Sequence, residues 1–394
     1  MFPKISDLFN YLLGTTMELP VQTYGFFLAL AFLVAGSILW VELKRKEKEG
    51  KLQTRLSIIQ LNIKAGWPEI IIGASISTLV GFKFFGILFQ YRSFLLNPQE
   101  YLLSGKGSYW AALAILLVSL GHSLYRNHTI GKKDPEWAEQ IIHPAQHTWS
   151  ILIVAILSAL IGSKLFDIID NFDSFIQNPF HSIFSFSGLT FYGGLIVTVI
   201  TLIWYMRVIR LDWKQVIDAA APAVMIGYAV GRMGCHLSGD GCWGILNELS
   251  KPGWLSWLPD WAWASQYPHN VIKEGIHIPG CIGSNCSMLE KPVWPTSLYE
   301  SFVSLISFGI LWVSRKKLKA PVTLFGLFMI LNGMERFLIE KIRVNHRFSF
   351  LGMHPTQAEI ISFLLVISGC MVIWYFSKIH RRIPSETNNI NQYQ

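Results

Sequence analysis

Charge is scarce in this sequence. Only 15% of the 394 residues are Asp, Glu, Lys or Arg, and 52% are hydrophobic. Soluble globular domains carry roughly 25% charged residues, so this deficit excludes an ordinary soluble domain and indicates a membrane protein. The first apolar segment is long and lacks a small-residue cleavage site after it, so we expect no cleaved signal peptide.

Long apolar runs are what the chain has instead. A membrane-spanning helix needs about 20 apolar residues. We expect spans at 22–42, 68–90, 109–124, 149–168, 191–206, 217–235, 297–314, 321–340 and 357–377. Two of them are short and two carry charge. We therefore predict an all-α fold, that of a polytopic integral membrane protein with about nine transmembrane helices (seven to nine) and a periplasmic loop or head region.

Most of the 33 Lys and Arg residues fall into alternate loops. Cytoplasmic loops carry such an excess, so this pattern places the N-terminus outside and the C-terminus in the cytoplasm. The net charge of +8 is then a topology signal with some attraction to anionic lipid, and it gives no reason to expect nucleic acid as a partner. We divide the chain into N-terminal spans (1–148), a core (149–378) with a long outer loop (236–296), and a cytoplasmic tail (379–394).

Two parts of the chain resemble each other. The matching stretches are 80–85 with 161–166, 93–98 with 174–179, and 104–109 with 187–192. This predicts an internal duplication of a two-span unit running in one direction. The second copy has Gly193 and Gly194 where the first has Trp110 and Ala111, so we expect the second copy to carry a site. Close helix packing is the favoured interpretation of the paired glycines, and a ligand contact is the alternative.

The stretch 231–244 reads Gly-Arg-Met-Gly-Cys-His-Leu-Ser-Gly-Asp-Gly-Cys-Trp-Gly and follows an apolar run. An arginine at membrane depth is costly, and it normally faces a partner or a water-filled cavity. The glycines permit tight turns and a close approach of a ligand, while His236 and Asp240 add titratable groups. We therefore expect Arg232 to belong to a polar site at a membrane interface.

Further charges stand in the last spans. Arg336, Glu340 and Arg343 have i, i+4, i+7 spacing, which predicts that they share one face of one helix. Glu300, a turn into its span, needs a partner. An internal ion-pair ladder is one interpretation. Because guanidinium groups grip phosphate in bidentate fashion, we prefer a phospholipid headgroup bound between these residues and Arg232.

The outer loop is rich in tryptophan, which suits the headgroup layer. Cys281 and Cys286 close a short loop, so a disulfide is expected in an oxidising compartment. The pairing stays open, since Cys235 and Cys242 lie near the same face. A zinc site among these four is the disfavoured alternative, because the pairs are loosely spaced and no histidine cluster accompanies them.

Four blocks together resemble one family, bacterial prolipoprotein diacylglyceryl transferase. They are 231–244, 191–196 (Phe-Tyr-Gly-Gly-Leu-Ile), 295–300 (Pro-Thr-Ser-Leu-Tyr-Glu) and 336–343 (Arg-Phe-x-x-Glu-x-x-Arg), in the family's order. The resemblance implies a multi-pass protein of the bacterial inner membrane. It implies transfer of a diacylglyceryl group from phosphatidylglycerol to the lipobox cysteine thiol of a preprolipoprotein. This reaction forms a thioether, releases glycerol phosphate and uses no metal or cofactor.

The resemblance also assigns residues. Arg232 and Arg336 fall on the family's essential arginines, Asp240 where the family usually has Glu, and Gly244 on the signature's last glycine. The chain departs from the family at Tyr192, Cys235 and Asn332, where the family commonly has histidine, asparagine and tyrosine. Its signature is one residue longer, which resembles a variant subfamily with a Gly-Asp-Gly segment and a long outer loop.

These considerations give two sets of candidate residues. The catalytic candidates are Arg232, Arg336, His236, Tyr192 and Asp240. The phosphatidylglycerol-binding candidates are Arg232, Gly193, Gly194, Gly239, Gly244, Asn332, Glu340, Arg343, Tyr24 and Tyr299. For Tyr24 we favour an interfacial position, with ligand contact as the alternative.

The expected chemistry needs a thiolate, because the thiolate is the nucleophile. The arginines would hold the leaving phosphate as charge develops on it. A base would take the thiol proton. An unperturbed histidine titrates near pH ~6.5 and a tyrosine near ~10, so we place His236 ahead of Tyr192. A lipid or solute transporter and a catalytically silent lipid- or precursor-binding relative are the alternative hypotheses.

Overall fold

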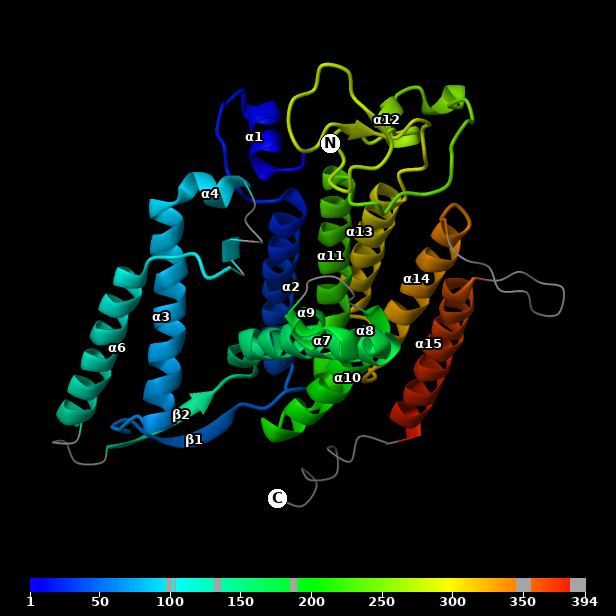
Figure 1. The fold of residues 1–394 in the computed structure, drawn as a ribbon. Coiled ribbons are helices and arrows are strands. Elements are labelled where there is room, and N and C mark those ends of the chain that lie inside the picture. The colour runs from blue at the N-terminus through cyan, green and yellow to red at the C-terminus, as the bar shows by residue number, and fades with distance from the viewer. Residues whose placement is uncertain (97–100, 103, 131–135, 185–189, 345–355, 383–394) are drawn as a thin grey trace. The chain divides into compact units, whose positions relative to one another are not determined.

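The structure is a computed structural model that describes residues 1–96, 101–102, 104–130, 136–184, 190–344 and 356–382 (Figure 1). The chain forms two compact units. The larger comprises Met1–Pro3, Gln22–Thr54 and His143–Gln394, and the smaller comprises Lys4–Val21 and Arg55–Ile142. The first long helix therefore belongs to the same unit as the core that carries the candidate residues.

The larger unit is mostly helical. Its long helices are α2 (Thr23–Lys48), α7 (Thr148–Asp170), α10 (Phe191–Val208), α11 (Trp213–Ser238), α13 (Thr296–Ser314), α14 (Thr323–Glu340) and α15 (Gln357–Arg382). Its short elements are η1 (Pro144–His147), α8 (Phe172–Gln177), α9 (Pro179–Phe184), η2 (Gly253–Leu255), α12 (Asp260–Trp263), β3 (Ile276–His277) and β4 (Ser287–Met288). Strands β3 and β4 pair antiparallel, with Ile276 opposite Met288.

The smaller unit contains α1 (Ile5–Leu13), β1 (Arg55–Gln60), α3 (Trp67–Phe89), α4 (Tyr91–Leu96), α6 (Tyr109–Ile130) and β2 (Trp137–Ile142). Strands β1 and β2 pair antiparallel, with Arg55 opposite Ile142 and Gln60 opposite Trp137. These strands depart from the predicted all-α fold. Six residues of weak alternation cannot be told from a loop by periodicity, so these two strands could not be predicted from the sequence.

The nine long helices of the described chain all lie where spans are predicted. Six are long and apolar enough to cross a bilayer by length and composition: Thr23–Lys48, Trp67–Phe89, Pro144–Asp170, Trp213–Ser238, Thr296–Ser314 and Gln357–Arg381. The apolar segment Gly193–Val208 is shorter. A multi-pass helical membrane protein is thereby confirmed.

The predicted duplication has a structural counterpart in each unit. In the smaller unit, the backbone N–H of Ser108 before α6 donates to the carbonyl of Phe82 on α3, at 3.0 Å. In the larger unit, the N–H of Thr190 before α10 donates to the carbonyl of Ser163 on α7, at 3.3 Å. Each of these contacts ties the start of one helix to the last third of the long helix before it. The two units thus share this contact, and the duplication itself stays a prediction.

Helix α11 lies between α2 and α13 and positions the site (Figure 1). Small residues allow these helices to approach closely. A Cβ atom added to Gly234 would lie 2.6 Å from the Cβ atom of Phe27 on α2. On the other side, the Ser301 hydroxyl of α13 donates to the carbonyl of Ala229, at 2.8 Å. Helix α11 is thus fixed against both neighbours near its C-terminal end.

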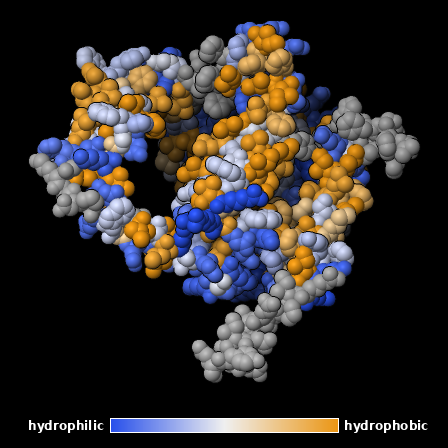
Figure 2. Space-filling view, turned by 90° about the horizontal axis from the view of Figure 1, so that it is seen from below, coloured by the Kyte–Doolittle hydropathy of each residue, from blue (hydrophilic) through white to orange (hydrophobic). Residues whose placement is uncertain are grey.

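Buried charges connect the N-terminal part of α11 to the start of α14 and to α2. Asp218 of α11 accepts hydrogen bonds from the backbone N–H groups of Val322 (2.8 Å) and Phe325 (2.9 Å) at the start of α14. This satisfies donors that a helix N-terminus leaves free and places a negative charge at its positive end. The Lys46 ammonium of α2 lies 3.9 Å from the same carboxylate. Figure 2 shows hydrophilic side chains gathered at this end of the larger unit.

The loop between α11 and α13 folds back onto the ends of both helices. The backbone N–H of Gly244 donates to the Trp294 carbonyl (2.9 Å), and Ser265 exchanges backbone hydrogen bonds with Val293. Cys281 and Cys286 form a disulfide, which decides the pairing that the sequence left open. Trp254 and Trp257 are mostly exposed, in keeping with the predicted headgroup position.

Candidate active site

The centre of the site is a buried carboxylate, Glu300 of α13. Three guanidinium groups surround it. The Nε atom of Arg232 lies 2.6 Å from Oε2, and Nη1 atoms of Arg343 and Arg336 lie 3.1 and 3.5 Å from Oε1. The sequence predicts that Glu300 needs a partner, and the structure gives it three from separate segments.

Helix α11 holds Arg232 through more than this ion pair. Its guanidinium lies 5.0 Å from the ring centroid of Tyr228, one turn earlier on the same helix. The Tyr228 hydroxyl lies 3.5 Å from Oε2 of Glu300. A guanidinium attracted to a ring face and paired to a carboxylate has little freedom, so Arg232 is held in one orientation.

The acids of the site are hidden while its arginines remain accessible. The Glu300 side chain is 1% exposed, whereas the Arg232, Arg343 and Arg336 side chains are 17%, 18% and 27% exposed. The carboxylate therefore binds the guanidiniums from the protein side and leaves donors available to a ligand. Guanidinium donors converging on one place suit an oxyanion, and phosphate fits their fork geometry.

Two more acids come from α14. Oε2 of Glu340 lies 3.4 Å from Nη2 of Arg336. Glu335 is 3% exposed, and neither of its carboxylate oxygens has a hydrogen-bond partner among the residues that the structure describes. It lies within electrostatic range of Arg232 and Arg343. Glu335 is not among the residues predicted from the sequence.

The prediction that Arg336, Glu340 and Arg343 share one helix face is wrong for Arg343. Helix α14 ends at Glu340, and Arg343 instead forms an antiparallel bridge with Gly244. The N–H of Ile245 donates to the carbonyl of Ile342, at 2.9 Å. The chain leaves the helix and runs beside the loop after α11, and from there Arg343 still reaches Glu300.

Gly244 makes this close approach feasible. A Cβ atom at this position would collide with the carbonyl oxygen of Ile342 and lie 2.8 Å from the Thr296 methyl group. The absence of a side chain at Gly244 is thus explained by contact between two backbone segments. Its predicted contact with lipid stays a prediction.

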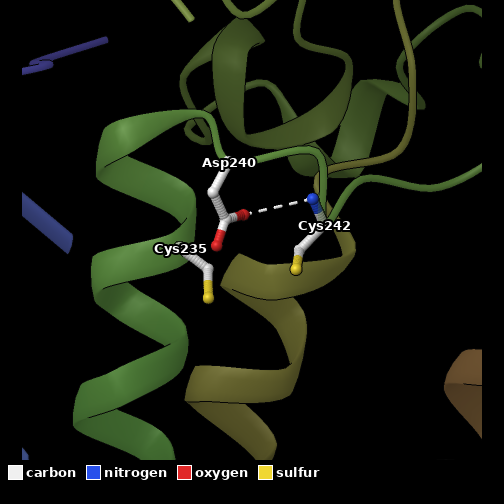
Figure 3. A group of neighbouring side chains, drawn as sticks. All are labelled: Cys235, Asp240 and Cys242. Atoms are coloured by element: carbon white, nitrogen blue, oxygen red, sulfur yellow. Dashed lines mark hydrogen bonds between the residues drawn. The ribbon is translucent and has the colours of Figure 1, made fainter. Parts of the chain in front are cut away.

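A second cluster lies where α11 ends. Cys235 is in the last turn, and Asp240 and Cys242 follow in the loop (Figure 3). Their Sγ and carboxylate oxygen atoms all lie within 4.8 Å of one another. Oδ1 of Asp240 accepts a hydrogen bond from the N–H of Cys242, at 3.1 Å. The neighbouring Cys235 thiol holds the pKa of the Cys242 thiol below its usual value.

Two glycines build this turn. Gly239 caps α11 in the left-handed conformation, with φ 65°, and its N–H donates to the Cys235 carbonyl, at 3.1 Å. Gly241 has φ 91°. Side chains are strained in this region of backbone conformation, so the Gly-Asp-Gly order is required by the shape of the turn. The turn places Asp240 between the two thiols (Figure 3).

His236 faces the aromatic residues of the loop. It is 2% exposed, its Nδ1 atom lies 3.2 Å from the Tyr267 hydroxyl, and its ring is 5.7 Å from that of Trp261. Burial raises the pKa of Tyr267 above its usual value. Within the described residues, no hydrogen bond or ion pair joins His236 to Arg232 or Glu300. The structure therefore does not bring this candidate base into the arginine cluster.

Three of the remaining candidate residues make contacts between helices or between a helix and the outer loop. Gly193 and Gly194 pack against α7, where added Cβ atoms would collide with Phe166 and Ser163, and this favours the packing interpretation. The Tyr299 hydroxyl donates to the Ala262 carbonyl, at 2.9 Å. Its position there ties α13 to the outer loop.

Two further candidates lie near the clusters. Tyr24, at the start of α2, is 40% exposed and lies within electrostatic range of Cys235, Asp240 and Arg232. Asn332 is half-buried on α14, one turn before Arg336. The side chain of Tyr192 lies outside the described residues, although its backbone belongs to α10.

The family model and the similar proteins found by comparison all have the same description. Residues 108–375 match the family model described as prolipoprotein diacylglyceryl transferase. Similar proteins are named phosphatidylglycerol–prolipoprotein diacylglyceryl transferase. One from Leptospira interrogans is 29% identical over 229 residues, covering 52% of this chain and 64% of the relative. One from Xylella fastidiosa is 28% identical over 237 residues, covering 57% and 75%.

A relative from Shouchella clausii with the same name is 25% identical over 284 residues, covering 71% of this chain and 90% of the relative. The chain spans less than two thirds of the Leptospira protein that it matches. The family match covers more than half of the chain and includes both clusters described above. The chain therefore belongs to the prolipoprotein diacylglyceryl transferase family.

Proposed function

We propose that this protein transfers the diacylglyceryl group of phosphatidylglycerol to the lipobox cysteine thiol of a preprolipoprotein. The products are a thioether-linked lipid and glycerol phosphate. One observation carries the proposal: three guanidinium groups converge on a buried carboxylate and keep part of their surface accessible. The names of the relatives supply the substrates, phosphatidylglycerol and a prolipoprotein.

The arginine cluster binds the phosphate of the lipid. A ligand phosphate takes the guanidinium faces that Glu300 leaves free. As the C–O bond between glyceryl carbon and phosphate oxygen breaks, negative charge grows on that oxygen. Donors already fixed in place stabilise this charge without reorganising, so they bind the transition state better than the lipid itself. Arg232 and Arg336 have this role, and Arg343 adds a third donor group.

The thiol must lose its proton to attack the glyceryl carbon. His236 and Tyr192 are the candidate proton acceptors from the sequence. Of these, His236 has its Nδ1 atom beside the Tyr267 hydroxyl, which leaves Nε2 for this purpose. Asp240 lies with the two cysteines of the second cluster (Figure 3).

We propose that the protein lies in the bacterial inner membrane with about nine spans, the α11–α13 loop outside and the C-terminus in the cytoplasm. Basic residues follow the ends of α2, α10 and α13, as expected for cytoplasmic loops. The loop that follows α11 then faces the compartment in which Cys281 and Cys286 can remain oxidised.

A direct assay tests the function. Purified protein is given phosphatidylglycerol vesicles and a synthetic lipobox peptide, and peptide mass is followed. We expect a diacylglyceryl mass on the cysteine peptide and none on a matched serine peptide. No product, under conditions in which the Leptospira or Xylella relative is active, would overturn the proposal and leave a lipid- or precursor-binding protein. Flux of lipid across the vesicle without product would favour the transporter.

A further inference from the structure

Glu335 of α14 is a buried acid to which the proposed reaction gives no role. It is 3% exposed, and in the described part of the chain neither of its carboxylate oxygens has a hydrogen-bond partner. Among the same residues, no ion pair includes Glu335. Buried polar groups in proteins are nearly always hydrogen-bonded, so this exception requires an explanation.

The guanidinium groups near Glu335 are already paired with other acids. Glu300 contacts all three guanidiniums of the arginine cluster, and Glu340 contacts one of them. The same three guanidiniums lie within electrostatic range of Glu335, and so does Glu300. Glu335 therefore lies beside the charged groups of the site without joining their ion pairs.

An ionised carboxylate is costly in this position. Taking a charge out of water without a hydrogen bond costs far more than burying a neutral carboxyl group. The negative charge of Glu300 adds repulsion, and both effects favour the protonated form of Glu335. The three arginines act in the opposite direction, but Glu300 and Glu340 already offset two of their charges.

The net charge of the cluster depends on this one proton. Three guanidiniums face the carboxylates of Glu300 and Glu340, so a neutral Glu335 leaves a net charge of +1. An ionised Glu335 leaves no net charge. The phosphate of phosphatidylglycerol is a diester with a single negative charge, which matches the first state and not the second.

We propose that Glu335 carries a proton in the resting protein and acts through the arginines as a positioning residue, so that the cluster keeps one positive charge for the phosphate of the lipid. This inference rests on the proposed function, because that function supplies the anionic lipid. Ionisation of Glu335 cancels the charge and weakens the binding of the phosphate. The affinity for phosphatidylglycerol then falls as pH rises.

Few other groups near the cluster can change their charge. The charged and titratable groups packed around α14 are Tyr228 and Arg232 of α11, Glu300 of α13, Arg336 and Glu340 of α14 itself, Arg343 after it, and Glu359 of α15, which pairs with Lys341. Arginine stays charged and tyrosine stays neutral near neutral pH, which leaves the acids. Of the acids on α13, α14 and α15, Glu335 alone has no ion pair within the described residues.

Lipid binding as a function of pH is the first measurement. Purified protein in detergent is titrated calorimetrically with short-chain phosphatidylglycerol from about pH 5 to about pH 9. The phosphodiester does not titrate in this range, so a change in affinity reports the protein. We expect the wild-type affinity to fall about tenfold with rising pH, the order of effect of one nearby charge. The affinity of Glu335→Gln, which is neutral throughout, should stay high.

Two variants and a second ligand serve as controls. Glu335→Asp keeps an acid at this position and should keep the dependence of affinity on pH. Glu248→Gln removes the acid of an exposed ion pair with Lys291 and should behave as the wild type does. Short-chain diacylglycerol, which lacks the phosphate, should bind equally at each pH to all of these proteins.

Stability against pH is the second measurement, and it needs no lipid. A glutamate that is neutral in the folded protein and ionised in the unfolded chain lowers the stability as pH rises above about 4.3, its ordinary value. We therefore expect the melting temperature of the wild type to fall with rising pH relative to that of Glu335→Gln. The two melting temperatures should be closest at acid pH, where Glu335 is protonated in both states.

Transfer kinetics connect the proton to the reaction. We expect the KM of the wild type for phosphatidylglycerol to rise with pH, and that of Glu335→Gln to stay constant, with kcat within about twofold between them at each pH. A residue that only supports the fold would not change the pH dependence of KM alone.

The outcomes separate this inference from the proposed function. A wild-type affinity that does not change with pH would overturn the inference without any variant. So would equal pH dependence in the wild type and Glu335→Gln, or melting temperatures of the two that run parallel. Binding and stability as expected, with no lipid transferred to the peptide, would contradict only the proposed function. Transfer with a pH-independent affinity would contradict only the role of Glu335.

Discussion

The Nε atom of Arg232 on α11 lies 2.6 Å from Oε2 of Glu300 on α13, and the Glu300 side chain is 1% exposed. Two further guanidiniums, from Arg336 and Arg343, contact Oε1 of the same carboxylate. One buried acid therefore fixes three cations that arrive from different segments. This arrangement predicts that stability and phosphate recognition depend on the same residue.

Replacing Glu300 by Gln keeps the shape of the side chain and removes its charge. Three guanidiniums then repel one another without a counter-charge. Loss of one partner from a fully buried ion pair costs about 3–5 kcal/mol. The arginines are partly exposed, so we expect a smaller but clear drop in melting temperature, together with loss of transfer. Glu248→Gln, at an exposed ion pair with Lys291, is the control. An unchanged melting temperature for Glu300→Gln would contradict the central role of this acid.

Arg232→Lys tests recognition separately from charge. Lysine keeps the positive charge but loses the planar fork and the contact with the Tyr228 ring. We expect the rate of transfer to fall about 10²-fold or more, in line with the loss of a donor to a developing oxyanion. Arg207→Lys, at an exposed position in the last turn of α10, should leave the rate unchanged. Equal rates for the two variants would show that charge alone suffices.

Gly244→Ala tests the close approach of two backbones. The added methyl group would collide with the Ile342 carbonyl, so the segment carrying Arg343 must move. Overpacking of this kind costs about 1–3 kcal/mol, and we expect reduced transfer and a lower melting temperature. The control is Gly253→Ala, where a Cβ atom meets nothing within 4 Å. A fully active and stable Gly244→Ala protein would mean that the bridge to Arg343 is unimportant.

The helices and part of the site could be predicted because their signals are local. Apolar length locates the spans, and a charge at membrane depth marks Arg232, Arg336 and Glu300 as needing partners. Which partner each one takes could not be predicted, since it depends on how α11, α13 and the segment after α14 approach one another. Arg343 illustrates this: its spacing predicts a helix face, but the helix ends before it.

The cluster of Cys235, Asp240 and Cys242 could not be predicted from the sequence, for a similar reason. Spacing suggests looking for pairs of cysteines or a nearby histidine. The groups that come together are instead one helix-end thiol, a carboxylate and one loop thiol, and a turn with two positive-φ glycines brings them together. Glu335 was missed because nothing in the sequence distinguishes it from an acid that faces its neighbour Arg336.

The identity of the base gives a further test. His236 is buried against Tyr267 and Trp261, so we expect His236→Gln to lower the melting temperature. Tyr267→Phe, which removes the same hydrogen bond, should do likewise. If neither residue takes the thiol proton, then His236→Gln and Tyr192→Phe both keep the wild-type dependence of transfer rate on pH. A shift of that profile in one variant alone, with its fold intact, would identify that residue as the base.

The last prediction concerns Asp218, far along α11 from the site. Its carboxylate accepts two backbone hydrogen bonds from the start of α14 and lies near Lys46. Asp218→Ala would leave two N–H groups at the start of α14 without their acceptor, at a cost of about 1–3 kcal/mol for an unsatisfied buried group, and would remove the carboxylate that lies near Lys46. Since α14 carries Arg336, we expect a lower melting temperature and weaker transfer that phosphatidylglycerol partly restores, because ligand binding stabilises the folded state. Asp260→Ala, at an exposed carboxylate, controls for the loss of charge. A stable Asp218→Ala protein with full activity would show that α14 is held in place by its packing against α15 and α13 alone.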